Sequence, residues 1–225
     1  MSQRVLILTN LFLTLALLCV SLIPFFKNNP AALSVGGQNF KYDDNKSEKK
    51  YHWPKQSLPI VVAAPLGLKS LIERDYIDSC ETWNRALGRK ILSCVFEDFD
   101  GTHPMKKSPK LNRLYFTKDW ASVYKYSDRL AITRRIPTMT LGSTIAHANI
   151  VFNMKYDFYF RSSLISMSEV QYEFKRVLIH ELGHFLGLEH ESDGNSVMKD
   201  TVSNNDPFTD LKNVDIESIR KKYKQ

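Results

Sequence analysis

The stretch from His180 to His190, which reads His-Glu-Leu-Gly-His-Phe-Leu-Gly-Leu-Glu-His, constrains the chain more than any other. An α-helix turns once every 3.6 residues, so His180 and His184 fall on one face and their imidazoles converge. Gly187 can take the left-handed conformation that ends a helix, which lets the chain turn back and bring His190 to the same point. Imidazoles beside a carboxylate, here Glu181, suit Zn²⁺, which takes three protein ligands and a water molecule in catalytic sites. The sequence therefore predicts a zinc site.

The same stretch carries a family resemblance. It matches the HExxHxxGxxH signature of the metzincin zinc metalloproteases at every fixed position, namely His180, Glu181, His184, Gly187 and His190. Met198 follows eight residues after His190 in the sequence Ser-Val-Met, which is similar to the methionine turn beneath the zinc-bound imidazoles of metzincins. The segment 213–223 resembles the closing helix of matrixin catalytic domains. The protein is therefore identified as similar to the matrixins.

This resemblance implies a fold and an activity. The implied fold is α+β and zincin-like, with a twisted mixed sheet and two long helices, followed after Gly187 by a small C-terminal subdomain that holds the methionine turn and the closing helix. The implied activity is zinc-dependent hydrolysis of peptide bonds, with Zn²⁺ on His180, His184 and His190 and with Glu181 as the catalytic residue that activates a water molecule.

The implied partner is a protein or peptide substrate, which would lie extended and pair with an edge strand of the sheet. Two segments are candidates for that edge, Thr138–Ser143 and Ile145–Phe152. His147 lies in an Ile-Ala-His-Ala setting similar to a strand of animal matrixins that bears a structural-zinc ligand, but the accompanying ligands are missing. We interpret His147 as a surface-strand residue and expect no second zinc. Asp200 stands where astacin-like enzymes carry a tyrosine, so the subfamily stays open.

Other interpretations of the histidine stretch also stay open. A surface helix can carry histidines by chance or as the relic of a lost site. A catalytically inactive, membrane-tethered binding module could keep the zinc without turnover. A structural zinc site would need a fourth protein ligand, for which Glu189 or Glu191 are the candidates.

The N-terminal region differs in composition from the rest. An apolar run of 22 residues extends from Val5 to Phe26, long enough to cross a bilayer as a helix. We expect residues 1–26 to be an uncleaved signal anchor, which makes a single-pass membrane protein with an extracytoplasmic catalytic domain. The alternative is a signal peptide cleaved near Ala31–Ala32 and a secreted protein. Residues 27–52 are polar and charged and predict a disordered linker, followed by the metalloprotease domain at 53–225.

The net charge and the cysteines limit which partners and which cellular compartment we expect. The net charge is +7, but the basic residues are scattered among acids and the clearest cluster, 220–224, lies at the C-terminal end, so we expect no nucleic-acid partner. We expect a monomer. Cys80 and Cys94 either form a disulfide between a helix and the following strand, as an oxidising compartment favours, or are free buried thiols.

Hydrophobic periodicity predicts the elements of the domain. An amphipathic helix is expected at Lys69–Leu87, closed by Gly88, and a second at Asn213–Tyr223. Ser166–Glu169 and Ser168–Gln171 both read as capping boxes, which predicts that the zinc helix starts there. Strands are expected at Leu58–Ala63, Ile91–Phe96, Leu114–Thr117, Leu130–Thr133, Thr138–Leu141 and Ile145–Phe152. The loop at 97–110 contains His103, which we interpret as a solvated histidine.

Overall fold

The computed structural model describes residues 40–41, 51–102, 111–123, 129–138, 143–162, 168, 171–204 and 210–223. The chain divides into two compact units, Met1–Gly36 and Gly37–Gln225, and all the described residues belong to the second. The predicted anchor, most of the predicted linker, His103 and residues 139–142 lie outside the described ranges. Within those ranges, no helix has the length and apolar character needed to cross a membrane.

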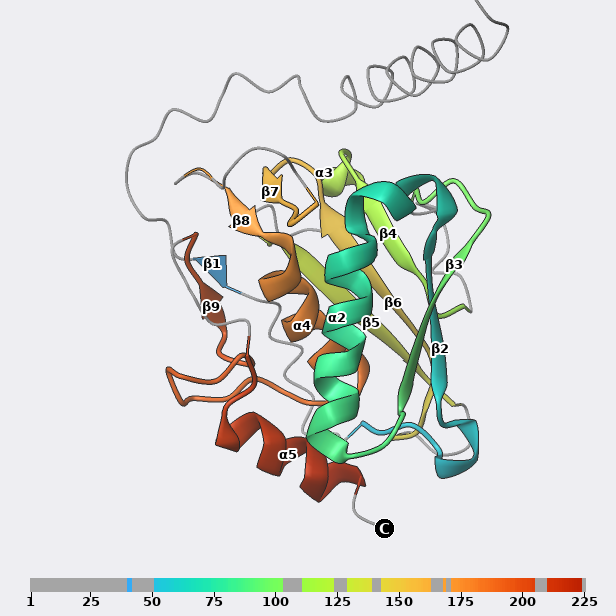
Figure 1. The fold of residues 1–225 in the computed structure, drawn as a ribbon, viewed down its shortest axis with the longest axis vertical. Coiled ribbons are helices and arrows are strands. Elements are labelled where there is room, and N and C mark those ends of the chain that lie inside the picture. Colours follow the sequence, from blue (N-terminus) through green and yellow to red (C-terminus); the bar gives the residue numbers. More distant parts are fainter. Residues whose placement is uncertain are drawn as a thin grey trace, which may run out of the picture. The chain divides into compact units, whose positions relative to one another are not determined.

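The sheet is mixed. β2 (Ile60–Pro65) pairs in parallel with β3 (Leu92–Glu97), and β6 (Ile145–Asn153) pairs in parallel with β4 (Leu114–Thr117) and antiparallel with β5 (Ala131–Pro137). A bridge between Ala63 and Arg113 connects β2 to the strand β4 that follows Arg113. The strand order is therefore β3-β2-β4-β6-β5 (Figure 1).

This order corrects one prediction. Ile145–Phe152 is not an edge, because β6 has a neighbour on each side; among the described strands the antiparallel edge is β5. The last six residues of β6 are all buried, as expected for a strand covered on both faces and not for an edge. The other candidate, Thr138–Ser143, lies largely outside the described residues, and its first residue directly follows β5.

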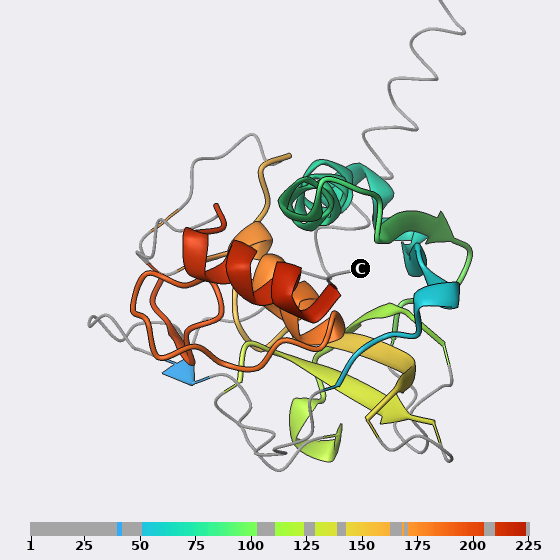
Figure 2. The same cartoon turned by 90° about the horizontal axis from the view of Figure 1, so that it is seen from below.

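Two helices lie side by side against one face of the sheet (Figures 1 and 2): α2 (Lys69–Leu87) and α4 (Phe174–Phe185). The bounds of α2 agree with the prediction, and Gly88 ends it with a φ of 65°. Its apolar stripe is buried, and the indole N–H of Trp83 donates to the carbonyl of Ile179 on α4 at 3.0 Å. A disulfide joins Cys80 of α2 to Cys94 of β3, which ties this helix to the sheet.

The zinc helix begins later than the capping boxes predict. Gln171 does bond back to the backbone N–H of Ser168, at 3.0 Å, as in a capping box. The next two residues, however, form β8 (Tyr172–Glu173), which pairs with β7 (Phe158–Tyr159), and α4 begins only at Phe174. The predicted start is wrong because pairing with a strand distant in sequence competes with the local helix signal.

α5 (Asn213–Tyr223) and Trp53 pack against the C-terminal end of α4. α5 has the predicted bounds, and the Tyr223 hydroxyl donates to the carbonyl of Leu186 at 2.8 Å just after α4. Trp53 donates its indole N–H to the carbonyl of Phe185 at 2.7 Å. The short strand β1 (Phe40–Lys41), inside the predicted linker, pairs antiparallel with β9 (Thr201–Val202).

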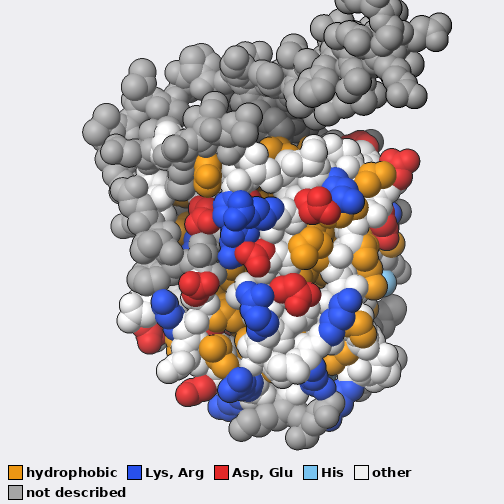
Figure 3. All heavy atoms as spheres, viewed as in Figure 1, with side chains coloured by type: hydrophobic (Ala, Val, Ile, Leu, Met, Phe, Trp, Pro, Cys, Tyr) orange, Lys and Arg blue, Asp and Glu red, His pale blue; other side chains and the backbone are white. Residues whose placement is uncertain are grey.

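The described part of the chain also contains α3 (Trp120–Val123) and two short 3₁₀ turns, η1 (Lys55–Ser57) and η2 (Leu66–Leu68). Trp120 joins Tyr115, Ile132 and Val151 in a small apolar cluster apart from the main core. Figure 3 shows Lys and Arg side chains interspersed with Asp and Glu over the face that carries α2. On that face, positive charge is not gathered into a patch.

Candidate metal centre

Three histidines meet at the C-terminal end of α4. His180 and His184 lie on the helix and are buried, and His190 lies on the following loop and is partly buried. One ring nitrogen from each lies within 4.8 Å of the others, and the Nε2 atoms of His184 and His190 are 3.0 Å apart. The spacing of the motif thus brings together all three predicted ligands.

Backbone carbonyls fix the orientation of the two helical imidazoles. Nδ1 of His180 lies 2.8 Å from the carbonyl of Val197, and Nδ1 of His184 lies 2.9 Å from the carbonyl of Leu188. A carbonyl oxygen only accepts hydrogen bonds, so each Nδ1 carries the proton and each Nε2 keeps its lone pair. This is the tautomer in which Nε2 can bind a metal.

Gly187 makes the turn that brings His190 back. Its φ is +89°, and its N–H bonds to the carbonyl of His184 at 2.8 Å. A Cβ at this position would lie 2.2 Å from the carbonyl oxygen of Tyr51, so the turn requires both the left-handed φ and the absence of a side chain. The role predicted for Gly187 in the turn is confirmed.

Met198 packs against α4 at Gly183, which lies between His180 and His184 in sequence. Its side chain is fully buried, and a Cβ on Gly183 of α4 would come within 2.2 Å of its sulfur. The turn that carries Met198 is held by Asp215 of α5, whose carboxylate accepts from the Ser196 hydroxyl at 2.5 Å and from the Val197 N–H at 3.2 Å. Asp215 was not predicted as a site residue, because the pattern of its helix marks only the apolar positions.

Two arginines share the carbonyls that hold the imidazoles. Arg176 donates to the Val197 carbonyl at 3.0 Å, and Arg135 donates to the Leu188 carbonyl at 3.4 Å. Arg135 also forms an ion pair with Glu189 at 2.9 Å. Both arginines therefore fix the loops that orient the predicted ligands.

Burial keeps the helical histidines neutral. It lowers the pKa of His180 well below its ordinary value, and the neighbouring His184, His190 and Arg176 lower it further. Burial, followed by the effect of His190, lowers the pKa of His184 to about 3. Neutral imidazoles are the form that binds a metal.

Glu181 follows the first histidine and is also buried, with 1% of its surface exposed. Its carboxylate oxygen Oε2 lies 2.6 Å from the hydroxyl of Thr133 on the edge strand β5. Thr133 was not predicted as a site residue. No local pattern could have indicated it, because 48 residues separate the two side chains in sequence.

The donor set fits zinc with an open position. Ligand nitrogens about 2.0–2.1 Å from a tetrahedral zinc lie about 3.3 Å from one another. The Nε2 atoms of His184 and His190 are 3.0 Å apart, and the nitrogen of His180 lies within 4.8 Å of both. Glu189 is paired with Arg135 and Glu191 accepts from the hydroxyl of Ser218 at 3.0 Å, and neither belongs to the group of described side chains close enough to hold one ion.

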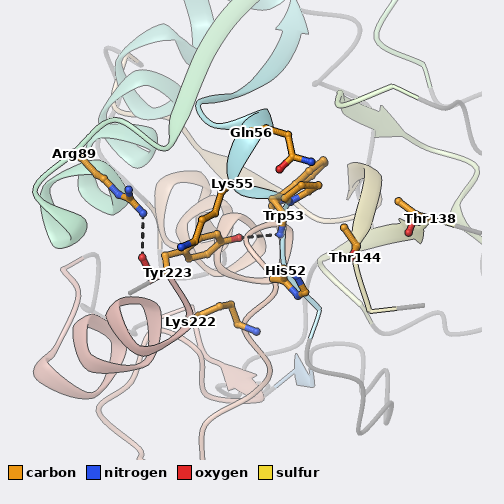
Figure 4. Close-up of a pocket in the computed structure, with 10 residues that line it drawn as sticks. His52, Trp53, Lys55, Gln56, Arg89, Thr138, Thr144, Lys222 and Tyr223 are labelled. Carbon is orange, nitrogen blue, oxygen red and sulfur yellow. Dashed lines mark hydrogen bonds between the residues drawn. The ribbon is translucent and has the colours of Figure 1, made fainter. Parts of the chain in front are cut away.

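Other candidate positions lie apart from this centre. Among the described residues the three histidines are the only group of three or more metal-binding side chains close enough to hold an ion, and His147 is not part of it. A pocket of about 470 Å³ lies beside α5 (Figure 4). There the Tyr223 hydroxyl accepts from the backbone N–H of Trp53, and the Tyr223 carbonyl accepts from Arg89. None of the three histidines lines that pocket.

A mixed sheet, two long helices, a cluster of three histidines and a methionine buried against the same helix are the features expected of a zinc metallopeptidase of α+β architecture. The family model described as matrixin matches residues 76–224, more than half of the 225-residue chain. The chain belongs to the matrixin family, whose members are zinc-dependent metallopeptidases, and the predicted family and fold class are confirmed. No curated protein matches it.

Proposed function

We propose that this matrixin is an endopeptidase that binds zinc through His180, His184 and His190 and uses Glu181 as its catalytic residue. The observation that carries the proposal is the position of the edge strand. β5 pairs with β6 on one side, and its residue Thr133 contacts Glu181. A peptide that adds to the other side of β5 would pass beside the carboxylate and the three imidazoles.

The residues present can perform each step of hydrolysis. Zinc at this site would supply a Lewis acid and lower the pKa of a water molecule toward 7. Glu181 accepts a proton from the attacking water as its oxygen bonds to the peptide carbonyl carbon. Glu181 then delivers that proton to the amide nitrogen as the carbon–nitrogen bond breaks, which releases an amine and a carboxylic acid.

The test is the Glu181→Gln variant of the full chain in detergent. It should bind one zinc per chain, as the wild type does, and lose about 10²- to 10⁴-fold in kcat on quenched peptides, the usual contribution of a general base. Glu73→Gln is the matched control, because Glu73 is an exposed residue of α2 that forms an ion pair with Lys69. Wild-type cleavage by zinc-loaded Glu181→Gln would refute the mechanism. A zinc-loaded wild type that cuts no peptide in a broad library would favour the inactive binding module.

We also propose that residues 1–26 anchor the protein in a membrane with the catalytic domain outside the cytoplasm. The apolar run Val5–Phe26 supports an anchor, and the disulfide Cys80–Cys94 supports an oxidising compartment. The intact chain should resist alkaline extraction from membranes. Recovery in the medium of a chain that begins near residue 33 would instead indicate a cleaved signal peptide and secretion.

A further inference from the structure

We propose that Thr133 is a positioning residue for Glu181: its hydroxyl holds the oxygen Oε2, so that proton transfer falls to Oε1. The proposal rests on the function proposed above. It gives a role in the reaction to a residue outside α4, on β5, the strand to which the substrate would pair.

The pleat of β5 directs Thr133 toward the helices. Neighbouring residues of a strand point to opposite faces. Ile132 packs in the small cluster with Tyr115, Trp120 and Val151, so Thr133 points to the other face, where Ala131 belongs to the main core. Only 4% of Thr133 is exposed. The hydroxyl is thus buried at the contact between β5 and α4.

The distances indicate which bond the hydroxyl makes. Oγ1 of Thr133 lies 2.6 Å from Oε2 of Glu181 and 2.9 Å from the backbone carbonyl of the same residue. A hydroxyl has one proton to donate, and an O–H···O⁻ bond to a carboxylate typically measures about 2.5–2.7 Å. The short bond therefore goes to Oε2, and the carbonyl is the secondary acceptor. Threonine is also branched at Cβ, which restricts its χ1 and keeps the hydroxyl in place.

The consequence for catalysis follows from geometry. A general base must lie within hydrogen-bond reach of the proton that it removes, and small displacements cost large factors in rate. A glutamate side chain has several rotatable bonds, and the bond from Thr133 fixes the last of them. Because β5 is also the strand to which the peptide would pair, Thr133 keeps the base in register with the bound substrate.

The test compares Thr133→Val, which keeps the shape and removes the hydroxyl, with Thr133→Ser, which keeps the hydroxyl. For zinc-loaded full-length protein, Thr133→Val should lower kcat about 10- to 100-fold, the effect of losing a hydrogen bond to a charged group, with KM changed less than about twofold. Thr133→Ser, which keeps the hydroxyl, should have a kcat within about threefold of the wild-type value. The matched control is Thr117→Val, which makes the same change at another buried strand position.

A double variant separates positioning from a general structural effect. If Thr133 acts through Glu181, then Thr133→Val should cause no further loss in a Glu181→Gln background. An equal loss in both backgrounds, or an unchanged kcat in Thr133→Val, would overturn the proposal. Wild-type activity of Glu181→Gln would instead count against the proposed function.

A crystal structure of zinc-loaded Thr133→Val tests the proposal without reference to activity. The Glu181 carboxylate should occupy more than one conformer in that variant and a single conformer in the wild type. One conformer, unchanged from the wild type, would show that the hydroxyl does not hold the carboxylate.

Discussion

The two halves of the histidine cluster are held in different ways. The helical half, His180 and His184, is buried on α4, and its two Nδ1 atoms bond to carbonyls that come later in the chain. The loop half, His190, is partly buried and owes its place to the turn at Gly187. Helical spacing places two ligands on one face of α4, whereas the third also needs the turn at Gly187.

The difference extends to what a substitution would damage. The helical half is supported from several directions, by the Met198 side chain, the Val197 carbonyl and the Asp215 carboxylate behind it. The loop half is flanked by the ion pair between Arg135 and Glu189 and by the hydrogen bond from Ser218 to Glu191. At its turn, a Cβ on Gly187 would lie 2.2 Å from the carbonyl oxygen of Tyr51. We expect a substitution at the turn of the loop half to cause a large loss of stability and zinc affinity, and a substitution around the helical half to cause a smaller one.

The largest effect is expected from Gly187→Ala. The new Cβ would meet the carbonyl oxygen of Tyr51 at 2.2 Å while φ stays at +89°, and backbone atoms cannot yield as a flexible side chain can. We expect a loss of about 3 kcal/mol or more in the free energy of unfolding, from strain and steric overlap together. Zinc affinity should fall at least about tenfold as His190 moves away. Urea unfolding and chelator competition measure the two effects.

Two other glycines serve as controls for Gly187→Ala. Gly88→Ala keeps a left-handed φ of 65° but meets no atom within 4 Å, so it isolates the cost of the backbone conformation. Gly194→Ala meets no atom and has no such φ, and it should be nearly neutral. If Gly187→Ala destabilises no more than Gly88→Ala and retains zinc, the close approach to Tyr51 does not govern the loop half.

An intermediate effect is expected from Asp215→Asn, which acts on the helical half. The carboxylate accepts from the Ser196 hydroxyl, the Val197 N–H and the Lys212 N–H, and an amide offers one acceptor oxygen in place of two. Leaving a buried donor unsatisfied costs about 1–3 kcal/mol. Zinc affinity should fall several-fold, because the Val197 carbonyl orients His180.

The control for Asp215→Asn is Glu217→Gln, which neutralises an exposed acid of the same helix α5. Thermal unfolding and zinc competition should show little change in this control. Equal losses in both variants would indicate a general effect of charge on α5 and no specific support of the methionine turn.

Local patterns predicted the parts of the fold that local forces decide. The bounds of α2 and α5 follow from apolar spacing and, for α2, from Gly88 as a left-handed end. The three histidines meet as predicted, because helix geometry and one glycine turn are enough to bring them together. β4 also has the bounds predicted from its short apolar run.

Long-range pairing decided what the patterns missed. The start of α4 depends on the pairing of Tyr172 with Phe158, and the edge of the sheet depends on which strand lies between β4 and β5. β5 runs on to Pro137, beyond the predicted end at Thr133, because its pairing with β6 continues as far as Ile145. Such contacts cannot be read from one segment alone.

The smallest effect is expected from acid acting on the helical half of the zinc-free protein. Burial lowers the pKa of His184 to about 3, below the value near 6.5 in an unfolded chain, so protons bind preferentially to the unfolded state. The stability is fully present above pH 6.5 and is lost as the pH falls from there toward 3. Between pH 7 and 5.5 this one group should cost about 1 kcal/mol in the free energy of unfolding, and the lowered pKa of His180 adds a loss of the same sign.

Urea unfolding of the chelated protein at the two pH values measures this loss, and His184→Gln is the comparison variant. Glutamine does not titrate, so its pH dependence should be weaker by the contribution of His184. An unchanged pH dependence in His184→Gln would mean that the imidazole of His184 becomes protonated in the folded protein. The helical half would then tolerate a protonated imidazole without loss of stability. Only the turn at Gly187 would distinguish it from the loop half.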